Sequence, residues 1–196
     1  NSTVLNNGTT NSSELILASG NNITSTITTA DVGKGILTLA GGTQTVTGSV
    51  GSGAELKEVN AGVNGSNSTL NLIGSSIVSG QVADITNKLN VINAGVNGSN
   101  STFSSDVFAT NLDLEGTGTV NLNGNFEGTA INYNDAGIVN LANGKNITAA
   151  IISDGVNQGT LNLIGSSIVS GQVADITVAA GVDHGGVSGF KKKISS

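Results

Sequence analysis

The sequence has 196 residues, long enough for one domain with a sizeable core, and carries a net charge of -6 without any arginine. Hydrophobic residues make up 37% and charged residues only 10%, a balance that argues against intrinsic disorder. Nucleic-acid binding is excluded as a function class, because the basic residues cluster only in a short run, residues 191–193. The absence of cysteine excludes a disulfide framework, zinc–thiolate sites and thiol catalysis.

Short apolar–x–apolar triplets recur along the chain and predict β-strands with both apolar side chains on one face. Several triplets are followed by a glycine and a second short β run, and helical periodicity is not sustained anywhere. Most successive triplets follow one another at the spacing of a single β-helix turn, but one step is clearly longer and another much shorter. In chain order the triplets are Leu15/Leu17, Leu37/Leu39, Leu70/Leu72, Leu89/Val91, Leu112/Leu114, Val120/Leu122, Val139/Leu141 and Leu161/Leu163.

Two segments of the sequence occur twice without change. Residues 60–69 (NAGVNGSNST) recur as residues 93–102, and residues 69–86 (TLNLIGSSIVSGQVADIT) recur as residues 160–177. Duplications of this length indicate that the chain grew by copying of segments, which a stack of repeated units accepts without redesign.

The triplet spacing and the duplications favour a solenoid over an antiparallel sandwich. Proline is absent from the chain, as expected where strands pair on both edges and need every backbone N–H. We therefore predict an all-β fold, a right-handed parallel β-helix (β-solenoid) with rungs of roughly 19–24 residues. The β-helix is expected to span residues 1–189, with residues 190–196 as a basic tail.

Asparagine stands between the two apolar residues in five of the triplets. When the apolar side chains point inward, these asparagines point outward, where side chains stacked about 4.8 Å apart can form a hydrogen-bonded ladder. A polar stripe that binds a ligand is the alternative use of the same residues. The five are Asn71, Asn90, Asn121, Asn140 and Asn162.

Groups suited to catalysis are scarce in this sequence. The single histidine, His184, follows Asp183, but adjacent residues of an extended chain point to opposite faces. A G-x-S-x-G nucleophile motif is absent. We therefore expect no catalytic residue, no bound metal and no cofactor.

Acidic residues are the remaining candidates for chemistry, because parallel β-helices include polysaccharide lyases. Such enzymes usually bring clustered acids together with a Lys or Arg base, whereas the thirteen acids of this chain are scattered. The closest groupings are Glu55/Glu58 and Asp113/Glu115, and the second pair shares one face of a predicted strand as a weak cation site or as solvated surface. A polysaccharide-acting β-helix enzyme of the lyase or hydrolase type is thus the alternative function.

Residues 30–51 (ADVGKGILTLAGGTQTVTGSVG), the NAGVNG blocks and the Leu-Asn-Leu segments resemble the passenger repeats of the rickettsial surface cell antigen family of outer-membrane autotransporters. The resemblance covers most of residues 1–189. It implies a β-helix passenger that is exported to the cell surface through an outer-membrane barrel and promotes adhesion to and invasion of host cells.

On this resemblance we expect a non-enzymatic passenger segment at the bacterial cell surface or outer membrane, or in secreted form, that contributes to host-cell adhesion and invasion or to a protective coat. The expected partner is a host-cell surface protein, and contact with the outer membrane would run only through a barrel that this sequence does not include. The sequence starts at Asn1 without an initiator Met or a signal peptide, and we expect an internal segment. Its exposed terminal strands would fray or associate end to end.

Overall fold

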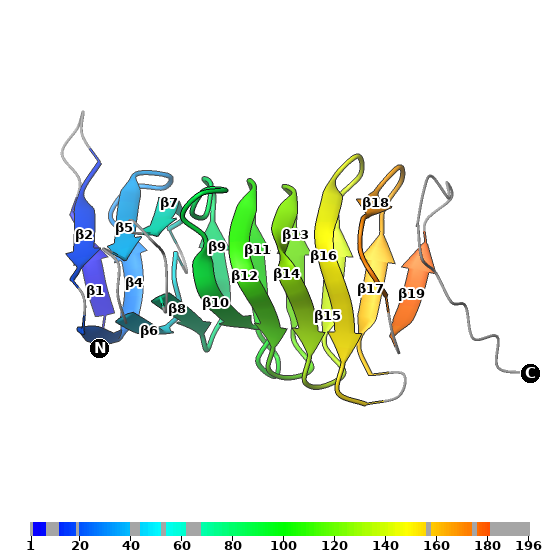
Figure 1. Ribbon diagram of the computed structural model, residues 1–196. Helices are drawn as coiled ribbons and strands as arrows, with labels where there is room; N and C mark the ends of the chain where they lie inside the picture. Colours follow the sequence, from blue (N-terminus) through cyan, green and yellow to red (C-terminus); the bar gives the residue numbers. More distant parts are fainter. Residues whose placement is uncertain are drawn as a thin grey trace, which may run out of the picture.

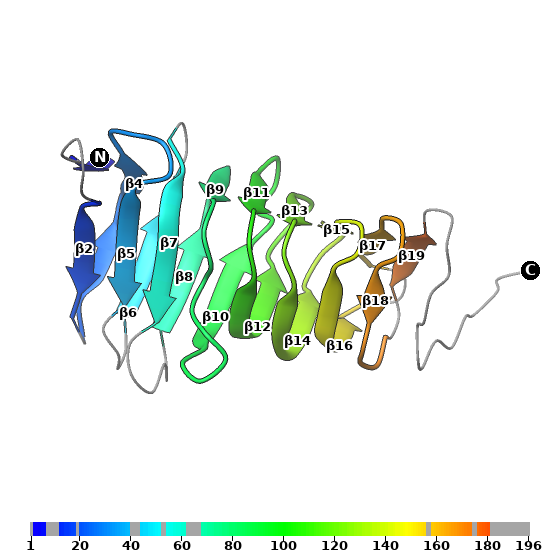
Figure 2. The same ribbon diagram turned by 90° about the horizontal axis from the view of Figure 1, so that it is seen from above.

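The protein is an all-β solenoid. The computed structural model describes residues 2–6, 12–18, 20–39, 44–51, 54–61, 68–155, 158–173 and 176–180. Every regular element in these ranges is a β-strand, and none is a helix. Figures 1 and 2, two views turned by 90°, show the strands stacked along one axis, from β1 and β2 at one end to β19 at the other.

The strands are short, and glycine, asparagine and serine are frequent in the turns that separate them. Their bounds are β1 (Ser2–Leu5), β2 (Glu14–Leu17), β3 (Asn22–Thr24), β4 (Thr26–Thr29), β5 (Gly35–Leu39), β6 (Gln44–Gly48), β7 (Leu56–Ala61), β8 (Ser68–Leu72), β9 (Ser76–Val78), β10 (Leu89–Ala94), β11 (Asn100–Phe103), β12 (Val107–Leu114), β13 (Thr119–Leu122), β14 (Phe126–Tyr133), β15 (Ile138–Leu141), β16 (Asn146–Ser153), β17 (Thr160–Leu163), β18 (Ile168–Val169) and β19 (Thr177–Ala180).

The strand pairs among the described residues are all parallel, so each turn of the chain lies directly on the turn before it. An 8-stranded sheet has the order β18-β16-β14-β12-β10-β8-β6-β3, and a 9-stranded sheet has the order β19-β17-β15-β13-β11-β9-β7-β5-β2. β1 and β4 form a separate 2-stranded sheet. The prediction of an all-β parallel β-helix is confirmed.

Each turn has three faces, which we number 1 to 3, and on each face inward side chains stack in columns by strand pairing. Face 1 carries the column Val78, Phe103, Leu122, Leu141 and Leu163. Face 2 carries the column Leu37, Val59, Val82, Val107, Phe126, Ile147 and Val169. Face 3 carries the column Val46, Leu70, Ile92, Leu112, Ile131, Ile151 and Val173.

The faces differ in how their strands are divided. β9, β11, β13, β15, β17 and β19 lie on face 1, whereas β6, β8 and β10 lie on face 3. The 8-residue strands β12, β14 and β16 begin on face 2 and continue across one corner onto face 3. The strand β7 links the two large sheets, because its Leu56 pairs with Val78 on face 1 while its Val59 pairs with Val82 on face 2.

The core of the solenoid consists of these three columns and their inward neighbours. Leu70, Leu72, Leu161 and Leu163 have exposed fractions of 0%, 1%, 1% and 6%, as the alternation predicted. The asparagines between them are half-buried and lie on the outer side. Each fully buried aliphatic side chain contributes about 1.5–3 kcal/mol of transfer free energy, so the columns supply the main driving force for stacking.

The irregular triplet spacings follow from the three faces. Leu37 lies on face 2 and Leu70 on face 3 of the next turn, so the step between them is one turn and one face long. Leu112 and Val120 lie on consecutive faces, so the step between them is only a fraction of a turn. Turn lengths also vary, from the short turn between Thr160 and Thr177 to the long turn between Val78 and Phe103, a range slightly wider than the prediction.

The predicted triplet Leu89/Val91 is wrong. Leu89 and Ile92 are buried, but Asn90 and Val91 are two consecutive half-buried residues on the outer side. The same pattern recurs in β12, where the strand crosses the corner between faces 2 and 3. A corner adds one residue to the period-two alternation, and the strict alternation assumed from the sequence therefore placed Val91 on the wrong side.

The duplicated segments lie on different faces of the solenoid. In the first copy, residues 69–86, β8 lies on face 3 and β9 on face 1. In the second copy, residues 160–177, β17 lies on face 1 and β18 on face 2. The same sequence therefore folds in two positions around the axis.

Candidate functional surface

An asparagine ladder runs along the outer side of face 1. The Nδ2 of Asn140 donates to the Oδ1 of Asn121 at 2.8 Å, and Asn162 donates to Asn140 in the same way at 2.7 Å. Asn121 donates to the Oδ1 of Asn100 at 2.6 Å and to the Oγ1 of Thr102 at 3.2 Å. Each side chain donates toward the preceding turn, so the ladder is continuous from β17 back to β11, as predicted for Asn121, Asn140 and Asn162.

A second polar ladder runs along the outer side of face 3 and contains a carboxylate. Asn93 donates to the Oδ1 of Asn71, and Asn132 donates to the Oδ1 of Asp113 at 2.6 Å. Asn93 and Asp113 are register partners on β10 and β12, which joins the two halves of the ladder. The sequence predicted Asn71 as a ladder residue; in the next turn the ladder position belongs to Asn93, and the predicted Asn90 lies at the corner.

A third set of polar side chains lines the corner between faces 1 and 2. The Oδ1 of Asp106 accepts a hydrogen bond from the backbone N–H of Asn125 at 2.8 Å, and the Oδ1 of Asn125 accepts one from the N–H of Asn146 at 3.0 Å. These side chains satisfy backbone donors where the strands separate. Sequence reasoning missed this ladder, although each member directly precedes a residue of the face 2 column at separations of 19 and 21 residues.

The predicted acidic pair, Asp113 and Glu115, lies on one side at the end of β12. Each carboxylate accepts a hydrogen bond from the next turn, Asp113 from Asn132 and Glu115 from the Nδ2 of Asn134 at 3.0 Å. Three His, Cys, Asp or Glu side chains placed to hold a metal ion are not found within the described ranges. Both carboxylates belong to the same inter-turn hydrogen bonding as the ladders.

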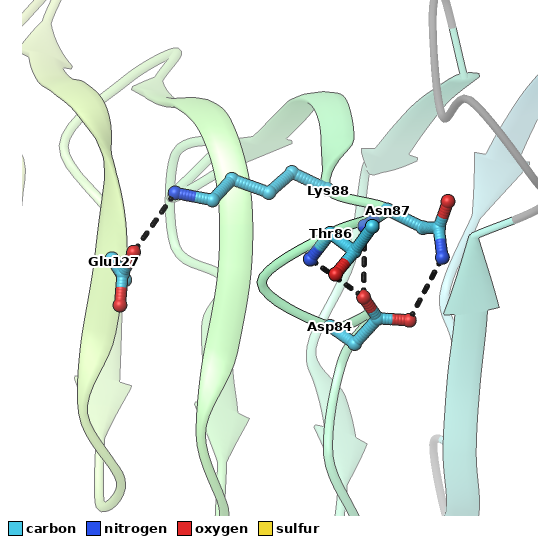
Figure 3. Close-up of polar contacts among 5 residues, drawn as sticks. All are labelled: Asp84, Thr86, Asn87, Lys88 and Glu127. Atoms are coloured by element: carbon cyan, nitrogen blue, oxygen red, sulfur yellow. Dashed lines mark hydrogen bonds and ion pairs between the residues drawn. The ribbon is translucent and has the colours of Figure 1, made fainter.

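A loop between faces 2 and 3 holds the most elaborate polar cluster of the described residues. The carboxylate of Asp84 accepts hydrogen bonds from the backbone N–H of Thr86 at 2.7 Å, from the N–H of Asn87 at 2.8 Å and from the side chain of Asn87 at 3.2 Å (Figure 3). The bonds from Asn87, its backbone N–H first, lower the pKa of Asp84 below the usual 3.8. This closed loop fixes the start of β10.

Lys88, which follows the loop, makes an ion pair two turns along the solenoid. Its side chain extends across β12, and its Nζ lies 3.1 Å from the Oε1 of Glu127 on β14 (Figure 3). The residue of β12 opposite Glu127 is Phe108, which packs partly buried against the core. The ion pair therefore joins three successive turns on their outer side.

The remaining candidates of the sequence lie outside the described residues. These are His184 and Asp183, the end of the predicted β-helix at residues 181–189, and the basic tail at residues 190–196. The pair Glu55/Glu58 is described and half-buried, and Glu58 accepts a hydrogen bond from the Nδ2 of Asn60 at 3.1 Å.

Inside the solenoid, Tyr133 is the largest fully buried side chain. Its hydroxyl donates to the backbone oxygen of Thr160 at 3.0 Å, and burial raises its pKa well above the ordinary value of 10.0. The hydroxyls of Ser99 and Ser101 are also buried, and neither has a hydrogen-bond partner in the part of the chain that the structure describes. These groups face inward and do not contribute to the outer ladders.

Comparison with known proteins gives no match to any family model, to any curated protein or to any solved structure. Among the described residues there is no helix of the length and hydropathy needed to cross a membrane. The resemblance to autotransporter passengers therefore rests on the quoted sequence segments alone.

Proposed function

We propose that this chain is a non-enzymatic segment of a bacterial surface-exposed autotransporter passenger, which contributes to host-cell adhesion and invasion or to a protective surface coat. The proposal starts from the resemblance of residues 30–51 to rickettsial passenger repeats. It is supported by the way in which the solenoid uses its outer faces.

The observation that carries the proposal is the position of the duplicated segments. An active site needs a few side chains held in fixed positions relative to one another. Residues 69–81 and 160–172 present the same outward side chains on different faces. Copying of this kind multiplies surface and adds length without bringing reactive groups together, which fits an extended surface protein better than a polysaccharide-acting enzyme.

The outer surface also suggests how adhesion would work. The chain has no arginine or tryptophan, Phe103, Phe126 and Tyr133 are buried, and Phe108, on the outer side, is partly buried beneath the Lys88–Glu127 ion pair, so the outer faces described here lack the exposed aromatic and arginine side chains that usually dominate binding energy. Contact with a host-cell surface protein would be spread along the amide and hydroxyl groups of the ladders. Binding by one molecule is therefore weak, and many molecules together bind tightly.

Beads coated with the purified segment test this proposal on cultured host cells. We expect the beads to bind cells at high coating density, while the soluble segment binds weakly and competes poorly. Beads coated with an unrelated acidic β-helix at the same density are the control. Equal binding of both kinds of bead would contradict a role in adhesion, and the role in a protective surface coat would remain. Release of reducing ends from a panel of polysaccharides would favour the polysaccharide-acting enzyme instead.

A further inference from the structure

Residues 69–81 and 160–172 of the longer duplicated segment have the same inward and outward side chains although they lie on different faces. Leu70, Leu72 and Val78 of the first copy are buried, as are Leu161, Leu163 and Val169 at the matching positions of the second. Ile73 and Ile164 are exposed at 57% and 50%. The inward orientation of these apolar residues is therefore independent of the face that they occupy, although the backbone differs at Gly165, which has a φ of +63° that its counterpart Gly74 lacks.

The neighbours above and below the two copies are different. In register, Leu70 stands between Val46 and Ile92 on face 3, whereas Leu161 stands between Val139 and Val178 on face 1. In both places the register partners are β-branched aliphatic residues of similar volume, which is the kind of exchange that cores tolerate. The segment needs an aliphatic column beneath it and does not need one particular face.

Both duplications are offset by whole turns plus one face. The second long copy lies four turns and one face beyond the first. Leu72 of the first copy lies on face 3, and Val78 lies on the next face, face 1. Leu163, which matches Leu72 in the second copy, lies four stacking steps above Val78 on that face. The shorter duplication places Asn60 on face 2 and Asn93 on face 3 of the next turn. The offset between the two short copies, which residues 60–92 span, is thus one turn and one face.

We infer that residues 60–92 are a face-independent module that lengthens the solenoid and turns everything after it by one face. Each added copy would extend the axis by about 6 Å and present the downstream ladders in a direction rotated by about a third of a turn. The inference does not depend on the proposed surface role, because it follows from stacking alone.

The junctions of such an addition already exist in the protein. When residues 60–92 are repeated after Ile92, the first residues of the added copy are Asn60 and Ala61, identical to the native Asn93 and Ala94. The strand β10 is therefore completed without change. Thr69 and Leu70 of the added copy then lie over Ile77 and Val78, where the native protein places Thr102 and Phe103.

The test is a variant with residues 60–92 duplicated in tandem. We expect it to unfold cooperatively, with a melting temperature at or above that of the parent chain, because the added turn buries its own columns. A matched control carries an insertion of the same segment in scrambled order, which keeps length and composition but removes the columns. The control should lose cooperative unfolding.

Engineered cysteines then report the face, since the chain has no cysteine of its own. In the parent, Ile77→Cys and Thr102→Cys are register partners on the outer side and should form a disulfide. In the duplicated variant the original Ile77→Cys should instead cross-link with Thr69→Cys of the added copy, and its cross-link with Thr102→Cys should disappear. Mobility on non-reducing gels distinguishes these outcomes.

Persistence of the original Ile77–Thr102 cross-link in the duplicated variant would overturn the inference, because the added copy would then be looped out. A second variant, in which residues 60–92 are deleted, tests the same inference if the longer chain fails to fold. The deletion joins Val59 to Asn93 and Ala94, which again restores the native sequence of β7, and it should also fold cooperatively. Failure of both the duplication and the deletion to fold would show that the faces are not interchangeable.

Discussion

Asn93 and Asp113 are register partners on the outer side of face 3, at a step of the ladder where the next side chain has no hydrogen to donate. Asn93 uses its Nδ2 to donate to Asn71, and the Asp113 carboxylate accepts from Asn132. The Oδ1 of Asn93 therefore faces a second acceptor. This step interrupts a pattern in which each amide donates to the turn before it.

Asp113→Asn should repair this step. The new Nδ2 can donate to Asn93 while the remaining oxygen still accepts from Asn132, so we expect the free energy of unfolding to rise by about 0.5–1.5 kcal/mol. Asp113→Ala, which removes the acceptor for Asn132, should lower it. Urea denaturation of the three proteins measures both effects, and a destabilised Asp113→Asn variant would contradict the proposed geometry.

The face 1 ladder predicts a different response at two asparagines that look alike in the sequence. Asn140→Ala removes one hydrogen bond to Asn121 and one from Asn162, and should cost about 1–2 kcal/mol. Asn90→Ala, at the corner of β10, is the matched control and should change stability by about 0.5 kcal/mol or less. Equal losses at the two positions would mean that the ladder adds nothing to stability.

Gly159 is required by its position against Tyr133. A Cβ at Gly159 would lie 2.0 Å from the Cδ1 of the Tyr133 ring, and its φ of +81° is unfavourable for any other residue. Gly159→Ala should therefore cost about 2–4 kcal/mol. Gly144→Ala has a similar φ of +70° with open space around it, and should cost only about 1 kcal/mol. Thermal unfolding separates the steric contribution from the conformational one.

The tyrosine itself gives a prediction for alkaline pH. Its pKa is raised in the folded state, so the folded protein keeps a proton that the unfolded chain releases above pH 10.0. The contribution of Tyr133 to stability is therefore complete below pH 10.0 and falls as the pH rises beyond it. Because the chain has one tyrosine and no tryptophan, ultraviolet absorbance reports this group directly.

We expect the tyrosinate absorbance to appear together with loss of β structure in circular dichroism, in one alkaline transition. In urea the same group should titrate near the ordinary value of 10.0. Tyr133→Phe is the control. Because it has no hydroxyl to ionise, its free energy of unfolding should fall less between neutral and alkaline pH than that of the parent protein, and its alkaline transition should move to higher pH. A smooth titration near the ordinary value in the folded protein would show that the hydroxyl is accessible to water.

The sequence predicted the columns of the core better than the corners. Period-two alternation was sufficient for Leu70, Leu72, Leu161 and Leu163, because both residues of each triplet lie on one flat face. It failed at Val91, because alternation carries no information on where a strand bends between faces. The spacing of the triplets fitted a turn of two or three strands and could not decide between them, since a triplet has the same pattern on every face.

The two identical copies also differ in structure at their C-terminal ends, which no local sequence pattern could predict. In the first copy Ile85 is 62% exposed in the loop that Asp84 closes with Asn87. In the second copy Ile176 packs against the core and Thr177 begins β19. The residue after the copied segment is Asn87 in one case and Val178 in the other, so an amide suited to a turn is replaced by a β-branched residue suited to a strand.

The placement of the copied segment has an immunological consequence. The outward side chains around Ile73 and Ile164 form the same epitope twice, four turns and one face apart, which is about 20 Å along the axis and a third of a turn around it. An antibody fragment raised against one copy would also bind the other. Because the two copies face different directions, two fragments could bind one chain without colliding. Such a fragment should saturate the protein at two per chain, and intact antibodies should link the molecules into linear or cyclic chains.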